Sequence, residues 1–212
     1  MKDQARLRLL RAEDYAAKPW KNGQGVTRDV LLAPVSDDFD VRVSLADIPP
    51  SSTFSAFPGI CRHITRISGD ALALTFADGH VEHLELMTPF TFDSGKTPYC
   101  EASGADTRVL NVMTRETVWR SSVEPMAEGR HRIAPPRDGL ILLFAVAGTW
   151  TAEAGTLAAR CRPGETLLAT GPAAIGLAGT SGGRALLARL TPVAPDRAAI
   201  SDIFDISELP AR

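Results

Sequence analysis

Short strand-like segments separated by glycine and proline turns recur along the whole chain. Residues 40–46 are the clearest example, because valine and leucine on one face alternate with Arg42 and Ser44 on the other. No segment has the long helical period that a parallel α/β sheet requires. Many short strands with turns at regular spacing predict an all-β sandwich or barrel.

This strand pattern occurs twice. Residues 64–69, an apolar strand followed by a turn, correspond to residues 142–148 in the second half. A charged, proline-bearing segment, residues 124–139, separates the two halves. We therefore expect two tandem jelly-roll barrels, one in residues 1–123 and one in residues 124–212, the second ending in a C-terminal arm.

Composition limits the partners that the chain is expected to have. The 212 residues carry a formal net charge of −2, so no basic surface points to nucleic acid or to an anionic membrane. The 3 cysteines are widely spaced and fit neither a disulfide framework nor a zinc site, which favours a reducing compartment. The longest apolar stretch, residues 140–147, is too short to span a bilayer, and the first residues do not form a signal peptide. We expect a soluble, cytoplasmic protein.

The residue types that most often carry catalysis are poorly arranged. The histidines do not form the His-x-His pair with a following glutamate that metal-binding double-barrel proteins use; they are His63, His80, His83 and His131. Glu82 and Glu85 lie near two of them, in a stretch typical of a solvated hairpin. No Gly-x-Ser-x-Gly elbow occurs, and no cysteine lies in an activating context. We expect no metal, no cofactor and no nucleophilic catalytic residue.

What remains is a set of cations, amides and hydroxyls on predicted strands. Arg62 and Arg66 share one strand face, and Asn111, Met113 and Arg115 share another. If these faces line one barrel, the pocket is cationic, and arginine binds carboxylates through two parallel hydrogen bonds. The alternative is that the arginines face solvent, since periodicity does not say which face is inside.

Residues 20–29 combine an aromatic ring, three charged side chains, two side-chain amides and two glycines, and read W-K-N-G-Q-G-V-T-R-D. This segment resembles the signature W-K-N-G-G-G-x-T-R-E of the HutD/Ves family. The resemblance continues in order through Arg42-Val43-Ser44, Phe54–Gly59, Arg62, Phe92-Asp93 and Asn111–Arg115. This sequence departs from the family at Gln24, Asp29 and Val41, where the family has glycine, glutamate and tryptophan. Most of the first half is covered, whereas the second half matches only in length and strand pattern.

The resemblance implies a bicupin without a catalytic metal or an established enzymatic activity. Family members accompany enzymes of histidine utilisation and are implicated in modulating that pathway, with N-formylglutamate as a proposed ligand. In this sequence Arg28, Arg62 and Arg115 are then the carboxylate partners, Asn22 and Asn111 the amide groups, and Lys21 a charge near the mouth. The predicted ligand-binding set is Trp20, Lys21, Asn22, Thr27, Arg28, Arg42, Ser44, Phe57, Arg62, Asn111, Met113 and Arg115.

Three functions stay open at this point. The first is a non-enzymatic receptor for a small acidic metabolite. The second is a metal-independent enzyme, an isomerase or hydrolase, for which His63 or Tyr99 is the available general base. The third is an interaction protein. Because edge strands need covering, a homodimer fits the sequence, but nothing in it fixes the oligomeric state.

Overall fold

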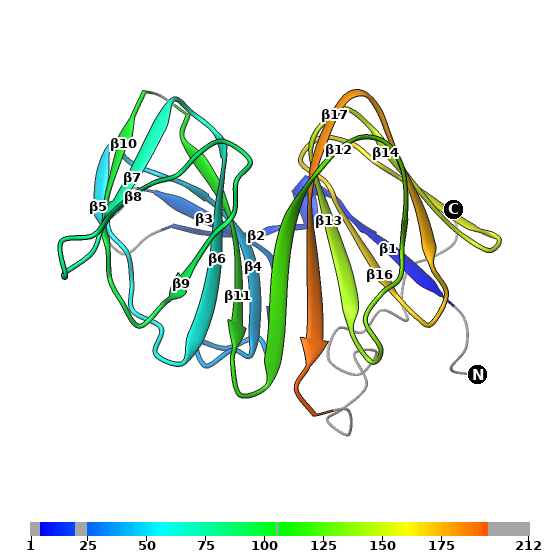
Figure 1. Cartoon of the computed structure of the whole chain (residues 1–212), viewed down its shortest axis with the longest axis horizontal. Helices are drawn as coiled ribbons and strands as arrows, with labels where there is room; N and C mark the ends of the chain where they lie inside the picture. Colours follow the sequence, from blue (N-terminus) through cyan, green and yellow to red (C-terminus); the bar gives the residue numbers. More distant parts are fainter. Residues whose placement is uncertain (1–4, 20–24, 105, 195–212) are drawn as a thin grey trace. The chain divides into compact units, whose positions relative to one another are not determined.

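The computed structural model describes residues 5–19, 25–104 and 106–194, whose regular secondary structure is almost entirely β-strand (Figure 1). The helical element of this part of the chain is a single 3-10 turn, η1, at Ala12–Asp14. Within the described residues there is accordingly no helix with the length and apolarity needed to cross a bilayer. The prediction of an all-β fold is confirmed.

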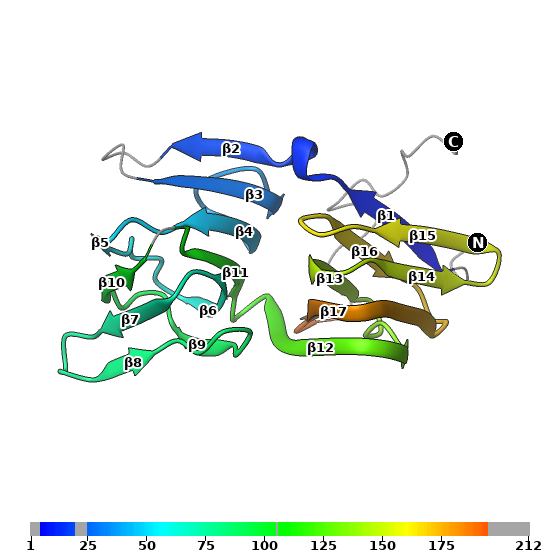
Figure 2. The same cartoon turned by 90° about the horizontal axis from the view of Figure 1, so that it is seen from above.

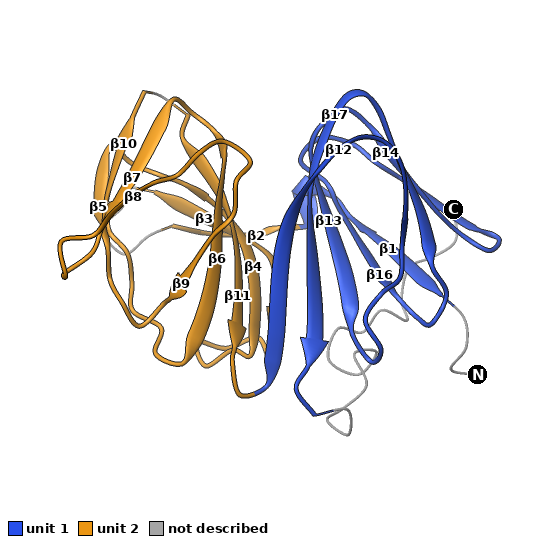
Figure 3. Ribbon diagram, viewed as in Figure 1, with its two compact units in different colours: residues 1–14, 118–212 blue, residues 15–117 orange. Residues whose placement is uncertain are grey.

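The chain divides into two compact units (Figure 3). Residues 15–117 form one, called here the N-terminal unit, and residues 1–14 with 118–212 form the other, called the C-terminal unit. The first strand, β1 (Arg6–Leu10), pairs with β16 (Thr166–Thr170) and so belongs to the sheet of the C-terminal unit.

The N-terminal unit contains two sheets. The larger is 6-stranded, in the order β2-β3-β4-β11-β6-β9, and the smaller is 4-stranded, in the order β5-β10-β7-β8 (Figures 1 and 2). The strands are β2 (Ala16–Pro19), β3 (Val26–Ala33), β4 (Val41–Asp47), β5 (Ser51–Thr53), β6 (Ile60–Ser68), β7 (Ala71–Thr75), β8 (Val81–His83), β9 (Phe90–Asp93), β10 (Tyr99–Ser103) and β11 (Arg108–Arg115).

The two sheets of the N-terminal unit share one apolar core. Ile64 and Val109 from the larger sheet pack in the same cluster as Leu72, Leu74 and Cys100 from the smaller one, and each of these side chains is at most 2% exposed. Burial of this apolar surface is the main force that holds two sheets face to face. The result is a barrel-like sandwich.

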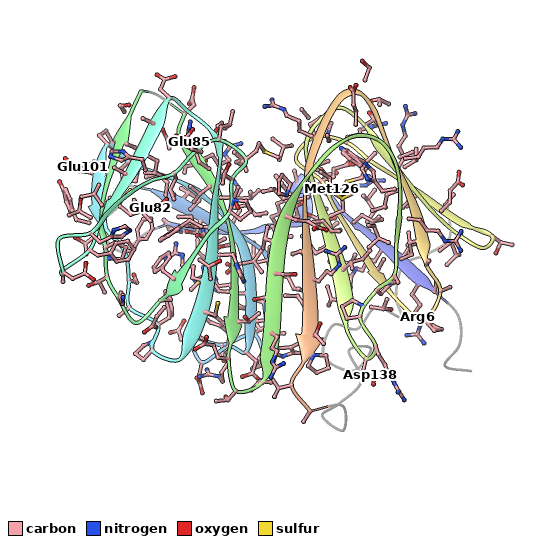
Figure 4. All side chains as sticks on the ribbon, viewed as in Figure 1. Arg6, Glu82, Glu85, Glu101, Met126 and Asp138 are labelled. Carbon is pink, nitrogen blue, oxygen red and sulfur yellow. The ribbon has the colours of Figure 1, made fainter. Side chains whose placement is uncertain are left out.

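The C-terminal unit is built on a 7-stranded sheet in the order β1-β16-β13-β17-β14-β15, with β12 paired to β17. The strands not yet given are β12 (Trp119–Ile133), β13 (Leu140–Ala147), β14 (Trp150–Ala154), β15 (Leu157–Cys161) and β17 (Ile175–Pro192). Its interior is apolar: Trp150, Ile141, Leu143 and Leu187 are at most 1% exposed, and Met126 from β12 joins them (Figure 4).

One sequence-based expectation about this unit is wrong. Residues 124–139 were expected to connect the halves, but residues 124–133 continue β12, which pairs with β17 from Trp119 onward. Pro125 is tolerated there because β12 has a partner strand on one side only, and the missing N–H can face away from that partner. Proline and charge are therefore signs of an edge strand in this segment.

Candidate functional site: a cationic cavity in the N-terminal unit

The register of three neighbouring strands brings the candidate polar residues together. Across β4, β11 and β6, Arg42, Met113 and Arg62 stand in one row, and Ser44 and Asn111 stand in the adjacent row. Because paired residues in antiparallel strands point to the same side, these five side chains share one face of the larger sheet.

This face borders a cavity of about 410 Å³ inside the N-terminal unit. Apolar contacts come from Phe54, Phe57 and Met113, and charge comes from Lys18, Asp37, Arg42 and Arg62. The residues of the predicted ligand-binding set that line the cavity are Thr27, Arg42, Ser44, Phe57, Arg62, Asn111 and Met113. The structure thus brings together seven residues that are far apart in the sequence.

Arg62 is the central charge of the cavity. It is only 7% exposed, and its guanidinium lies 4.4 Å from the ring centroid of Phe54 and 5.7 Å from that of Phe92. Among the described residues no carboxylate forms an ion pair with it. Burial, and then repulsion by Arg42, lowers the pKa of Arg62 to about 9. A buried cation in this state is stabilised by an anion that enters the cavity.

Asn111 orients Arg62. The amide oxygen Oδ1 of Asn111, itself 2% exposed, accepts hydrogen bonds from Nε and Nη2 of Arg62 at 3.0 and 2.8 Å. A guanidinium only donates, so the amide oxygen must face it and the amide NH2 must face elsewhere. The amide NH2 of Asn111 and the N–H groups of Arg62 outside these two bonds are therefore available to an acceptor such as a carboxylate.

Two further cations, Lys18 and Arg42, line the same cavity and share one carboxylate, that of Asp29. Asp29, 6% exposed, accepts a hydrogen bond from Nε of Arg42 at 2.7 Å and forms an ion pair with Nζ of Lys18 at 3.1 Å. One buried carboxylate thus holds two cations at the edge of the cavity that they line. Lys18 reaches this position because β2 pairs with β3, where Lys18 lies opposite Thr27.

Arg115 lies on the rim rather than in the cavity. It lines an adjoining space of about 490 Å³ that also includes Lys18, Arg42 and Phe57. Its guanidinium donates to the carboxylates of Asp38 and Asp40 and to the carbonyl oxygen of Phe39. Arg115 therefore holds the loop between β3 and β4. It was predicted to bind a carboxylate of the ligand, but its guanidinium binds carboxylates of this chain instead.

Arg28 does not line either space. It pairs with Leu45, one residue from the cavity face, so its side chain projects from the opposite side of the sheet. There it donates to Asp47 at 2.6 Å, and Arg108 binds the same carboxylate at 2.8 Å. Burial acts to raise the pKa of Asp47, but the two arginines outweigh burial and lower it. The expectation that Arg28 faces the same cavity as Arg62 is wrong, for reasons of strand alternation.

We expect the substitution Arg28→Met to leave ligand affinity within about twofold, because the side chain is outside the cavity and such half-exposed ion pairs contribute little. Its effect should instead be a small loss of stability at neutral pH, which shrinks as the pH falls. Because the pKa of Asp47 is lower in the folded chain than in the unfolded chain, its carboxylate stabilises the fold at pH values above the ordinary pKa. This stabilisation is lost as the pH falls through the lowered pKa. Calorimetric titration and thermal melts between pH 3 and pH 7 (about the window in question) would check both. Tenfold weaker binding would contradict this assignment.

Three members of the predicted set, Trp20, Lys21 and Asn22, lie outside the described residues, as does the C-terminal arm after residue 194. Conversely, the structure adds Lys18, Asp29 and Asp37, which sequence reasoning missed. Lys18 adjoins the family-like segment and Asp29 ends it, so their position was a usable signal. Asp37 had none, because it lies in a loop that looked like a solvated turn.

The residues considered for catalysis are placed elsewhere. His63 shares a row with Val112, on the face opposite Arg62, and its Nδ1 lies 2.7 Å from the hydroxyl of Thr91. Tyr99 is 44% exposed on β10, and neither residue lines the cavity. Burial raises the pKa of Cys100 to about 12, so this thiol stays protonated at neutral pH.

The hairpin that carries His80 and His83 does not gather metal ligands. His80 lies 3.5 Å from Glu82, whereas Glu85 follows β8 and is exposed (Figure 4). In the part of the chain that the structure describes, no group of three or more histidine, cysteine, aspartate or glutamate side chains is arranged to hold a metal ion.

The HutD family profile matches residues 12–187. The chain belongs to the HutD family. It is 32% identical over 143 residues to an uncharacterised 21.2 kDa protein from the hutC 3' region of Pseudomonas putida, covering 66% of this chain and 74% of that one. It is also 32% identical over 133 residues to protein Ves of Citrobacter koseri, covering 62% and 68%.

Solved structures agree with membership of the HutD family. HutD from Pseudomonas fluorescens SBW25 has a TM-score of 0.77 at 27% identity, covering 89% of this chain and 100% of that one. A conserved protein of unknown function from Pseudomonas aeruginosa PAO1 has a TM-score of 0.80 at 25% identity, covering 87% and 98%. Oxalate decarboxylase from Bacillus subtilis, at 9% identity and a TM-score of 0.57 over 90% and 77%, shows that the fold is cupin-like.

Proposed function

We propose that this HutD family member binds a small acidic metabolite in the cavity of its N-terminal unit and acts as a receptor rather than as an enzyme. The observation that carries the proposal is Arg62, a buried cation on the cavity wall without a carboxylate partner among the described residues. Burial of an unpaired charge is costly, so a site of this kind is retained where an anion completes it.

The chemistry of the lining favours a carboxylate over other anions. Arg62 keeps N–H groups that Asn111 does not occupy, and the amide NH2 of Asn111 is a further donor; planar donors of this kind match the two oxygens of a carboxylate. Phe54 and Phe57 offer apolar surface for a short carbon chain. Lys18 and Arg42 lie farther along the same cavity, where a second acidic group would gain from them.

Family membership supplies the biological context of the proposal. The relative from Pseudomonas putida lies in a hutC region, so we propose that the ligand belongs to histidine utilisation, with N-formylglutamate as the leading candidate, and that binding modulates that pathway. We further propose that each unit is one cupin barrel, which makes the chain a bicupin, and that it works in the cytoplasm. A homodimer stays a prediction.

Isothermal titration calorimetry with N-formyl-L-glutamate, L-glutamate and urocanate is the direct test. We expect saturable binding of at least one of these acids by the folded protein, with weaker binding at high salt because charge drives it. Absence of heat with all three, for a sample with a cooperative melting transition, would refute the receptor. Chemical change of the acid during incubation, followed by NMR, would instead establish an enzyme.

A further inference from the structure

Among the described residues that line the cavity, the acidic one is Asp37, which lies in an exposed loop. Asp37 lies in the loop between β3 and β4 and lines both the cavity and the adjoining space. No other described residue forms a hydrogen bond or an ion pair with its carboxylate. The two cations that line the same spaces, Lys18 and Arg42, are bonded to Asp29 instead.

The loop that carries Asp37 is held in place on its C-terminal side. Arg115 donates to Asp38, Asp40 and the carbonyl oxygen of Phe39. The ring of Phe39, 2% exposed, lies 5.5 Å from the ring of Phe57, which lines both spaces. The carboxylate of Asp37 is therefore presented at the cavity by a fastened backbone, although its own side chain makes no contact of this kind.

Arg62 and Asp37 carry charges of opposite sign on one cavity, and neither forms an ion pair with another described residue, so together they define the kind of molecule that fits. Arg62 on the sheet calls for an anionic group, and Asp37 on the loop calls for a positively charged or N–H-donating group. A plain dicarboxylate satisfies the first and brings a negative charge toward the second. A molecule with both a carboxylate and an N–H group satisfies both.

We propose that Asp37 determines specificity, so that the cavity selects an amino acid or N-acyl amino acid over a dicarboxylate that lacks nitrogen. This inference rests on the proposed function, because it concerns the same cavity. Asp37 accepts a hydrogen bond from the ammonium or amide N–H of the ligand while Arg62 and Asn111 bind its carboxylate.

Glutarate and L-glutamate form a matched pair for the test, since they differ only by the amino group; N-formyl-L-glutamate adds the acylated form. Dissociation constants of the three acids would be measured by calorimetry for the wild type, for Asp37→Ala, and for Asp78→Ala. Asp78 is an exposed acid in the hairpin between β7 and β8, away from the cavity lining, so its variant makes the same change in net charge.

We expect the wild type and Asp78→Ala to bind the two nitrogen-bearing acids about three- to tenfold more tightly than glutarate, the range for a solvent-accessible charged hydrogen bond. Asp37→Ala should lower that ratio to about one, with glutarate bound as well as before or better. An unchanged ratio in Asp37→Ala, or a wild type that prefers glutarate, overturns the inference and leaves the receptor standing. Failure of the wild type to bind any acid overturns both. Thermal melts check that Asp37→Ala stays folded, and Asp37→Asn serves as a second variant.

Discussion

Replacing Arg62 with methionine should weaken binding of the acidic ligand at least about thirtyfold, because truncating one partner of a buried, hydrogen-bonded charge pair costs roughly 2–5 kcal/mol. The unliganded protein should melt within a few degrees of the wild type, because relief of the buried cation offsets the loss of the two hydrogen bonds that Asn111 Oδ1 accepts. Methionine has a comparable volume, and it removes a buried cation that has no carboxylate partner among the described residues. Calorimetric titration and thermal denaturation of the same samples give the two readouts.

Arg66 provides a matched control for this prediction. It lies four residues along the same strand, β6, and is also 7% exposed. Its donors, however, serve two backbone carbonyls, those of Leu84 and Gly69. Arg66→Met should therefore cost about 1–3 kcal/mol of unfolding free energy per carbonyl left unsatisfied. If Arg62→Met is destabilised as much as Arg66→Met and still binds the acidic ligand with wild-type affinity, Arg62 is a structural residue and does not bind the ligand.

Replacing Trp150 with alanine should destabilise the C-terminal unit by about 3–5 kcal/mol, the range for deleting a buried tryptophan. Trp150 is fully buried in the apolar cluster of this unit. Its ring lies against the bare backbone of Gly179 on β17, where an added Cβ would be 2.9 Å from the ring. Urea unfolding measures the loss, and hydrogen exchange of amides in β13 and β17 assigns it to this unit.

A double-mutant cycle with Gly179→Ala makes the Trp150 prediction sharper. Gly179→Ala alone should be destabilising, because the ring must shift to admit the new methyl group. In the Trp150→Ala background the same methyl group finds space, so the two losses should fall short of additivity by about 1 kcal/mol or more. Additive losses, or a cost below about 1 kcal/mol for Trp150→Ala, would mean that the interior is not packed around this ring.

The cavity shows which inferences could be made from the sequence. Arg62 and Asn111 were identified because a cation and an amide on strand-like segments belong to a specific family signature. Asp37 could not be identified, since a loop acid next to Asp38 looks like an ordinary solvated turn. Its importance comes from Arg115 and Phe39, which hold the loop against residues that are distant in the chain.

The all-β class, the family and most of the polar side chains that share the cavity can be predicted from the sequence alone, because strand alternation and turn residues are local properties. Which face of each strand lines the cavity depends on contacts between distant segments and is visible only in the folded chain. Valines such as Val43 and Val112 occupy the other face of the larger sheet and are fully buried too, so apolar periodicity marks no unique inside. Strand register, set by pairing across the whole N-terminal unit, put Arg62 in the cavity and Arg28 outside it.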